Sequence, residues 1–177
     1  MASFVNRVVG AARLDVRTYE EVEADTTATP QAMGVVALAA LAGGVGVASA
    51  GGAGVVATVF GSLVGWVVWA ALIWIVGAKL LPESRTRADI GQLLRTLGFA
   101  ASPGLLLVLR ILPLVGGLIA FAIWIWQLAA TVVAVRQALD YESTGRAVLV
   151  CLIGWVVYVV VAVGIALMTG ITSINLG

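Results

Sequence analysis

Long apolar segments with almost no charge dominate this sequence. The clearest covers residues 54–81 and carries one ionisable side chain, Lys79, close to its end. As a helix this segment would be about 42 Å long, more than the roughly 30 Å hydrocarbon core of a bilayer. Since 62% of the 177 residues are hydrophobic and 11% are charged, a soluble domain of this size could not cover so much apolar surface. The sequence predicts an all-α, polytopic membrane helix bundle.

Five membrane spans are expected, and the pair Thr29-Pro30 marks the start of the first as a cap residue followed by proline. The third segment leaves 14 uncharged residues between Arg95 and Arg110, about 21 Å of helix. It either crosses with both arginines reaching the interfaces or re-enters on the same side. The spans are predicted at about 30–50, 54–81, 90–112, 114–139 and 144–168.

Residues 1–29 are expected to form a separate cytoplasmic or interfacial segment before the bundle at 30–177. Phe4, Val5 and Val9 can share one face of a short helix, with Arg7 opposite. Asp15 is a suitable N-cap for a second short helix. The two short amphipathic helices are predicted to lie along the membrane surface.

The distribution of basic residues predicts the topology. With five spans and the N-terminus inside, nine of the ten basic residues lie inside and only Arg110 lies outside. A re-entrant third segment would change the split to eight and two. Both counts follow the positive-inside rule. We therefore expect a multi-pass protein of the inner (cytoplasmic) membrane with a cytoplasmic N-terminus.

Several chemistries are excluded by residue content. The chain has no His and one Cys, which removes Ser-His-Asp triads, His-based zinc sites and haem ligation by histidine. No Asp or Glu falls inside a predicted span, which argues against an ion-coupled transporter. The net charge of +1 comes without a basic patch that would suit nucleic acid. We predict no catalytic residue, cofactor or metal, and a protein that is not an enzyme.

Small residues recur every four positions along the first two predicted spans. Such ladders allow helix backbones to approach closely within a membrane, and a glycine-rich turn joins the two spans. They predict a tight hairpin, although chance in an Ala- and Gly-rich chain is the alternative. The predicted packing residues are Ala53, Ala57, Gly61 and Gly65 on the second span and Ala40, Gly44 and Ala48 on the first.

Aromatic and polar side chains near the middle of the second and fourth spans suggest a groove. Trp66, Trp69, Trp124 and Gln127 lie far from the interfaces where tryptophan usually gathers. They predict either a groove for a lipid, a quinone, a pigment or a partner, or simple aromatic packing between the two spans. Gln127 is expected to hydrogen-bond across helices.

Charged residues around the loop after the fourth span suggest a docking surface on the cytoplasmic side. Arg136 and Asp140 stand four residues apart at the end of that span, with Arg146 beyond the loop and Arg95 in the third segment. This surface would bind either a partner or the acidic N-terminal segment of the same chain.

Three stretches resemble the prokaryotic branch of the Ypt-interacting-protein (Yip) family. They are RTYEEVEAD at 17–25 with Gln31-Ala32, LRTLGFAASPG at 94–104, and VAVRQALD at 133–140 followed by STGR at 143–146 and IGW at 153–155. The resemblance implies a five-span bundle with a cytoplasmic N-terminus. Eukaryotic members are trafficking factors that contact small GTPases, but their D-L-Y-G-P-type segment has no counterpart here. The resemblance transfers no binding residue and leaves the activity open.

Three functions are compatible with these features. The first is a non-enzymatic scaffold or accessory subunit that packs with itself or with a larger complex in the lipid bilayer. The second is a small channel or passive transporter with Arg95, Arg110 and Gln127 on its path. The third is a membrane enzyme, for which the acids of residues 20–25 and Asp140 are available, but nothing places a nucleophile beside them.

Overall fold

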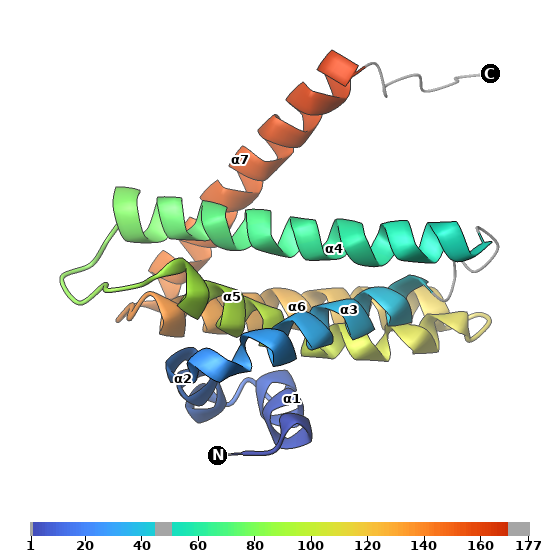
Figure 1. Cartoon of the computed structure of the whole chain (residues 1–177), viewed down its shortest axis with the longest axis horizontal. Coiled ribbons are helices and arrows are strands. Elements are labelled where there is room, and N and C mark those ends of the chain that lie inside the picture. Colours follow the sequence, from blue (N-terminus) through green and yellow to red (C-terminus); the bar gives the residue numbers. More distant parts are fainter. Residues whose placement is uncertain (1, 45–50, 170–177) are drawn as a thin grey trace.

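The computed structural model describes residues 2–44 and 51–169, and all regular elements in these two ranges are helices (Figure 1). This confirms the all-α class. The elements are α1 Phe4–Ala12, α2 Val16–Ala24, η1 Thr26–Ala28, α3 Thr29–Gly44, α4 Gly51–Ile73, the π-helix η3 Trp74–Leu80, α5 Ile90–Phe99, the 3₁₀-helix η4 Ser102–Ile111, α6 Gly116–Ala138 and α7 Thr144–Thr169.

Four helical segments in the described ranges are long and apolar enough to cross a membrane: Gly54–Leu80, Ile90–Ile111, Gly116–Ala138 and Thr144–Gly164. They coincide with the second to fifth predicted spans. The first predicted span is described only as helix α3, which has 16 residues, because residues 45–50 lie outside the described part. Four of the five spans thus have suitable helices, and the five-span topology stays a prediction.

The helices form a layer with further helices on both of its faces. In Figure 1, α3, α5 with η4, and α6 run side by side, α4 lies over one face, and α1 and α2 lie against the other. Helix α7 starts beside α4 and α6 and then diverges from the bundle. The α5–η4 segment is central: 56% of its most apolar stretch is buried, against 17% for α4 and α7.

Local sequence signals explain where the central segment begins and changes. Asp89 and Gln92 form a capping box at the start of α5, in which each side chain accepts a hydrogen bond from the other residue's backbone N–H. Pro103 then coincides with the change from α-helix to 3₁₀-helix because proline cannot donate to the helical ladder. Leu114 has a φ of 68° and turns the chain into α6.

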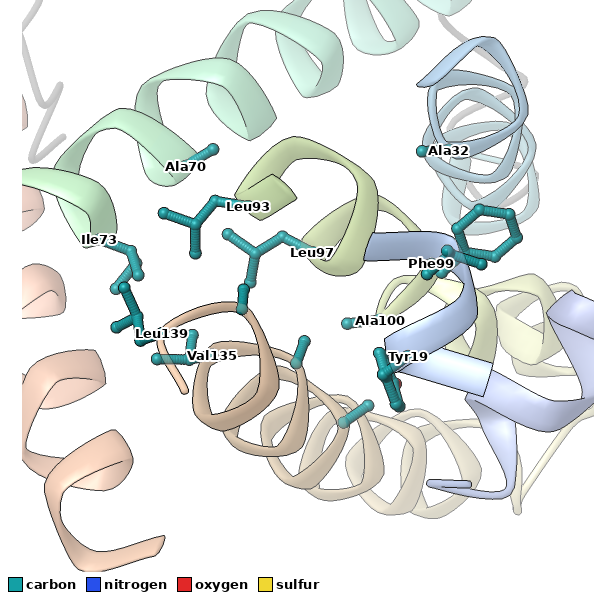
Figure 2. Close-up of a cluster of buried hydrophobic side chains, with 14 of the residues drawn as sticks. Tyr19, Ala32, Ala70, Ile73, Leu93, Leu97, Phe99, Ala100, Val135 and Leu139 are labelled. Carbon is teal, nitrogen blue, oxygen red and sulfur yellow. The ribbon is translucent and has the colours of Figure 1, made fainter. Parts of the chain in front are cut away.

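The hydrophobic core is concentrated at one end of the bundle. Figure 2 shows Leu93 and Leu97 of α5 meeting Ala70 and Ile73 of α4, together with Val135 and Leu139 at the end of α6. Tyr19, Ala32, Phe99 and Ala100 extend this cluster towards α2 and α3. We call this the core end. At the opposite end, the open end, large apolar side chains remain exposed: Val56 by 69%, Phe60 by 68% and Leu118 by 71%.

The closest helix contacts differ from the predicted ladder. A Cβ added at Gly61 or Gly65 would meet no atom within 4 Å, and one at Gly44 would only touch Thr58 at 3.9 Å. The close contact expected at Gly61 and Gly65 is therefore absent from the described part of the chain. A ladder identifies a helix face, but it does not say whether that face turns inward.

The close contact in this fold joins α3 to α5 and η4. A Cβ added at Gly98 would lie 2.6 Å from the Cβ of Ala32, and one added at Gly104 would lie 3.1 Å from the Cβ of Ala39. Of the other predicted packing residues, Ala40 lines a cavity and Ala57 is exposed on α4. The side chain of Ala53 and all of Ala48 fall outside the described residues.

Candidate functional site

Two cavities lie between the helices, and their walls share Gly65, Trp69, Gln127 and Thr131. We call the first the α3–α4 cavity; its volume is about 400 Å³ and its further lining residues are Val36, Ala39, Ala40, Ser62, Trp66, Leu97, Ala100, Ala101, Gly104 and Leu107. The second, the α4–α7 cavity, has about 750 Å³ and is further lined by Trp124, Leu128, Val132, Val148, Cys151, Leu152, Trp155 and Tyr158. The second cavity exists because α7 diverges from α4 and α6.

The structure brings the predicted groove residues to the walls of these cavities. Trp66 lines the first, Trp124 lines the second, and Trp69 and Gln127 line both. The same tryptophans also link helices: the Trp66 indole N–H donates to the carbonyl of Leu94 at 3.1 Å, and Trp69 meets Tyr158 edge to face at 6.5 Å. These contacts join α4 to α5 and α7, and no aromatic pair between α4 and α6 is found among the described residues, so aromatic packing between the second and fourth spans stays a prediction.

Gln127 does not make the cross-helix hydrogen bond expected of it among the described residues. Its main-chain carbonyl accepts from the hydroxyl of Thr131 at 2.8 Å, one turn along the same helix. Its side-chain oxygen faces Gly104, where an added Cβ would lie 3.3 Å away. This carboxamide is therefore a polar group on the shared wall of two largely apolar cavities, typical of a site that orients an apolar molecule or helix.

The cavity walls are poorly suited to acid–base or metal chemistry. Neither is lined by Asp, Glu, Lys or Arg. In the described part of the chain, no group of three or more His, Cys, Asp or Glu residues could hold a metal ion. The cavities offer shape, aromatic surface and one carboxamide.

The three residues of the predicted channel path do not line one passage. Arg110 is exposed at the open end, near the end of η4. Arg95 is 5% exposed at the core end and lines neither cavity. Only Gln127 faces the cavities, so the arrangement gives the channel hypothesis no continuous path among the described residues.

Arg95 binds the C-terminal end of α2. Its Nε donates to the carbonyls of Val22 and Glu23 at 3.0 and 3.1 Å, and its Nη2 also donates to the Glu23 carbonyl. A cation at a helix C-terminus interacts favourably with the helix dipole. Arg95 is thus used within the chain, where it holds the end of α2 through main-chain carbonyls and not through the N-terminal acids that the sequence suggested.

The other predicted docking residues lie in or beside the loop between α6 and α7 and make contacts there. Arg136 donates to the carbonyls of Tyr141 and Glu142, both at 3.2 Å. Arg146 pairs with Glu83 at 3.1 Å, which joins this loop to the end of α4. Asp140 is exposed with a φ of 52° and forms the turn. A partner for this surface stays a prediction.

Sequence reasoning missed the role of Arg7, which it placed on the solvent side of α1. Its side chain is 2% exposed and pairs with Glu21 at 2.9 Å and Asp25 at 2.7 Å. It also donates to Gln31 at 3.1 Å. Hydrogen bonds from the Ala2 N–H and from Arg7 lower the pKa of Glu21, and those from Thr27 and Arg7 lower the pKa of Asp25 to about 2. Two acids 14 and 18 residues downstream were the only signal.

These features define a helical integral membrane protein with apolar cavities between its helices. The Yip1 domain family model matches residues 26–165. The chain therefore belongs to the Yip1 family, as the resemblance predicted. No curated protein and no solved structure matches the chain.

Proposed function

We propose that this protein is a non-enzymatic membrane scaffold or accessory subunit. It packs with further copies of itself or with a larger membrane complex. We also propose, from the distribution of basic residues and the resemblance, that it lies in the cytoplasmic membrane of a prokaryote with its N-terminus inside. These proposals extend the family assignment, which covers the membrane fold and not a partner.

The observation that carries this proposal is a small-residue face that the monomer does not use. Ala57 and Gly61 are exposed on α4, and Gly61 has open space where a side chain would be. Phe60 and Val64 flank them and are 68% and 46% exposed. Small residues four apart allow another helix to approach closely in a membrane, where no hydrophobic effect drives helices together.

Helices α6 and α7 supply further apolar surface for such a contact. Phe121 and Trp124 of α6 stack at 6.2 Å and are 59% and 57% exposed. On α7, Trp155 is 59% exposed and lines the α4–α7 cavity. This cavity lies between the three helices and would accommodate side chains of an incoming helix or the chain of a bound lipid.

Native mass spectrometry of protein gently extracted from its own membranes tests the proposal. We expect a stoichiometric assembly, homomeric or heteromeric, from the unaltered chain. Gly61→Leu should convert the assembly to the monomer several-fold more readily without lowering its thermal stability, because a Cβ at this exposed position meets no atom within 4 Å.

The matched control is Gly34→Leu on α3, where an added Cβ also meets nothing within 4 Å. It introduces the same side chain outside α4, α6 and α7, so the assembly should survive. A bare monomer from the unaltered chain, or an assembly that Gly61→Leu leaves intact, would refute the proposed function.

A further inference from the structure

Helix α1 turns Arg7 inward, while Phe4, Val5 and Val9 are exposed together with the polar Asn6. Arg7 and Ala11 are buried, with Arg7 neutralised by Glu21 and Asp25. Val5 and Val9 are 64% and 41% exposed. A helix on a water-facing surface has the opposite arrangement, with apolar residues towards the core. The outward face of α1 therefore matches an apolar surrounding.

The position of α1 along the bundle places it beside the middle of a candidate membrane span. The indole N–H of Trp126 donates to the carbonyl of Ala12 at 2.7 Å. Trp126 lies near the middle of α6, which runs from Gly116 to Ala138. The twelve residues from Trp126 to Ala138 correspond to about 18 Å of helix. If α6 crosses the hydrocarbon core, Trp126 lies within that core. The end of α1, which contacts Trp126, then cannot lie outside the membrane.

The exposed face of α1 continues the lipid-facing surface of the neighbouring helices. Figure 1 shows α1 against the layer formed by α3, α5 with η4, and α6, on the face opposite α4. Ile125, next to Trp126 on α6, is 47% exposed, and Leu109 of η4, an element that α1 contacts, is 42% exposed. Arg7 would not enter lipid as an unpaired charge, because it already pairs with two carboxylates.

We propose that α1 lies within one leaflet of the bilayer, where Phe4, Val5 and Val9 contact lipid acyl chains. Arg13 and Arg17, which follow α1 in the sequence, are both exposed. Their long side chains can reach the phosphate layer while their stems stay in apolar surroundings. This inference does not depend on the scaffold proposal, since it concerns contact with lipid and not with another protein.

Site-specific fluorescence quenching tests this placement in the full chain. Single cysteines at Val5→Cys and Val9→Cys, in a Cys151→Ala background, would carry a polarity-sensitive fluorophore. Both positions are exposed, so a label there does not disturb the core. The protein would be reconstituted in vesicles of equal amounts of phosphatidylcholine and phosphatidylglycerol. Glu20→Cys, exposed on α2, is the matched aqueous control.

We expect acyl-chain nitroxide lipids to quench the labels at positions 5 and 9 several-fold more strongly than the label at position 20. Aqueous iodide should give the reverse order. Equal iodide quenching at the three positions would overturn the proposal, because α1 would then face water. Protection of positions 5 and 9 from both quenchers would also overturn it, because protein and not lipid would cover α1.

Discussion

At the scale of single residues, Gly98 sets the distance between α3 and α5. An alanine Cβ there would lie 2.6 Å from the Cβ of Ala32 and 3.1 Å from its backbone, and Ala32 is fully buried. Alanine favours a helix over glycine by about 1 kcal/mol, but overpacking a core costs about 1–3 kcal/mol or more. We expect Gly98→Ala to lower the free energy of unfolding in detergent.

The control for this variant is Gly34→Ala on α3. An added Cβ at Gly34 meets nothing within 4 Å, so only the gain in helix propensity remains and the variant should be slightly stabilised. Denaturant titration of both variants measures the difference. Equal stabilities of Gly98→Ala and Gly34→Ala would show that α3 and α5 can move apart without cost.

Glu23 makes the docking of α2 depend on pH. Burial raises its pKa to about 7, and the nearby charge of Asp140 adds to the increase while Arg95 opposes it. Glu20 and Asp89 also face it and raise the pKa further. The folded protein therefore holds this proton more tightly than the unfolded chain, whose Glu pKa is about 4.3. The contribution of protonated Glu23 to the free energy of unfolding is fully present below pH 4.3 and is lost as the pH rises through about 7.

Glu23→Gln should remove this dependence. Glutamine keeps an oxygen that can accept from the Gln92 amide, which donates to Glu23 at 2.9 Å. Between pH 5 and pH 8, the unaltered chain should lose roughly 1–3 kcal/mol that the variant keeps, measured as the free energy of unfolding. Glu20→Gln, on the exposed side of the same helix, should retain most of the loss, because burial and not Glu20 is the main cause of the raised pKa of Glu23. A parallel loss of stability in Glu23→Gln would contradict the assignment.

Individual contacts were harder to predict than residue types. The sequence placed Trp66, Trp69 and Gln127 at mid-span, and the structure brings all three to the wall of the α3–α4 cavity. The sequence could not show that the Gln127 side chain lacks a hydrogen-bond partner on another described helix, because such a bond depends on which side chains face Gln127 in the folded protein. It also put Arg7 in solvent, since helical periodicity gives a polar face without saying what covers it.

At the scale of elements, the end of the π-helix η3 depends on a side chain from the loop between α6 and α7. The π-helix η3 ends with the Leu81 N–H donating to the Val76 carbonyl at 2.9 Å. The next donor in this pattern would be Pro82, which has no N–H, so the carbonyl of Gly77 loses its partner. The Tyr141 hydroxyl, 2.9 Å from Gly77 O and 2.8 Å from Leu81 O, takes that place.

Tyr141→Phe should therefore destabilise the junction of α4 with the α6–α7 loop. Tyr141 is 4% exposed, so water cannot easily replace its hydroxyl, and the loss should be about 1–3 kcal/mol. Thermal unfolding in detergent measures it. Tyr158→Phe is the comparison, since Tyr158 is 41% exposed on α7 and should tolerate the change. Equal unfolding temperatures for the two variants would refute this role for Tyr141.

Helix positions were predicted well where a cap or a proline marks them. Asp15 caps α2 as expected, accepting from the Arg17 N–H at 3.2 Å, and α3 begins at Thr29 before Pro30. The π-helix at the end of α4 and the 3₁₀ character of η4 were not predicted. Both depend on hydrogen-bond shifts of one residue, to which apolar periodicity is insensitive.

At the scale of the whole molecule, the helical class and the family could be predicted from the sequence, but the arrangement of the helices could not. Charge counting separates the two sides of a membrane, yet it contains nothing about which helices are neighbours. The N-terminal segment was expected along the membrane surface, and the contact of Ala12 with Trp126 places it beside the bundle. Such a contact joins residues 114 positions apart, beyond the reach of local patterns.

The same separation sets the order in which the protein can assemble. Arg95 follows Val22 by 73 residues and Trp126 follows Ala12 by 114, so at roughly 5–20 residues per second α1 and α2 leave the ribosome several seconds before their docking sites. The partners of Arg7 all lie within the first 31 residues. The N-terminal segment can therefore form the ion pairs of Arg7 during synthesis, before α5 and α6 are made. The first part translated is then among the last to dock onto the bundle.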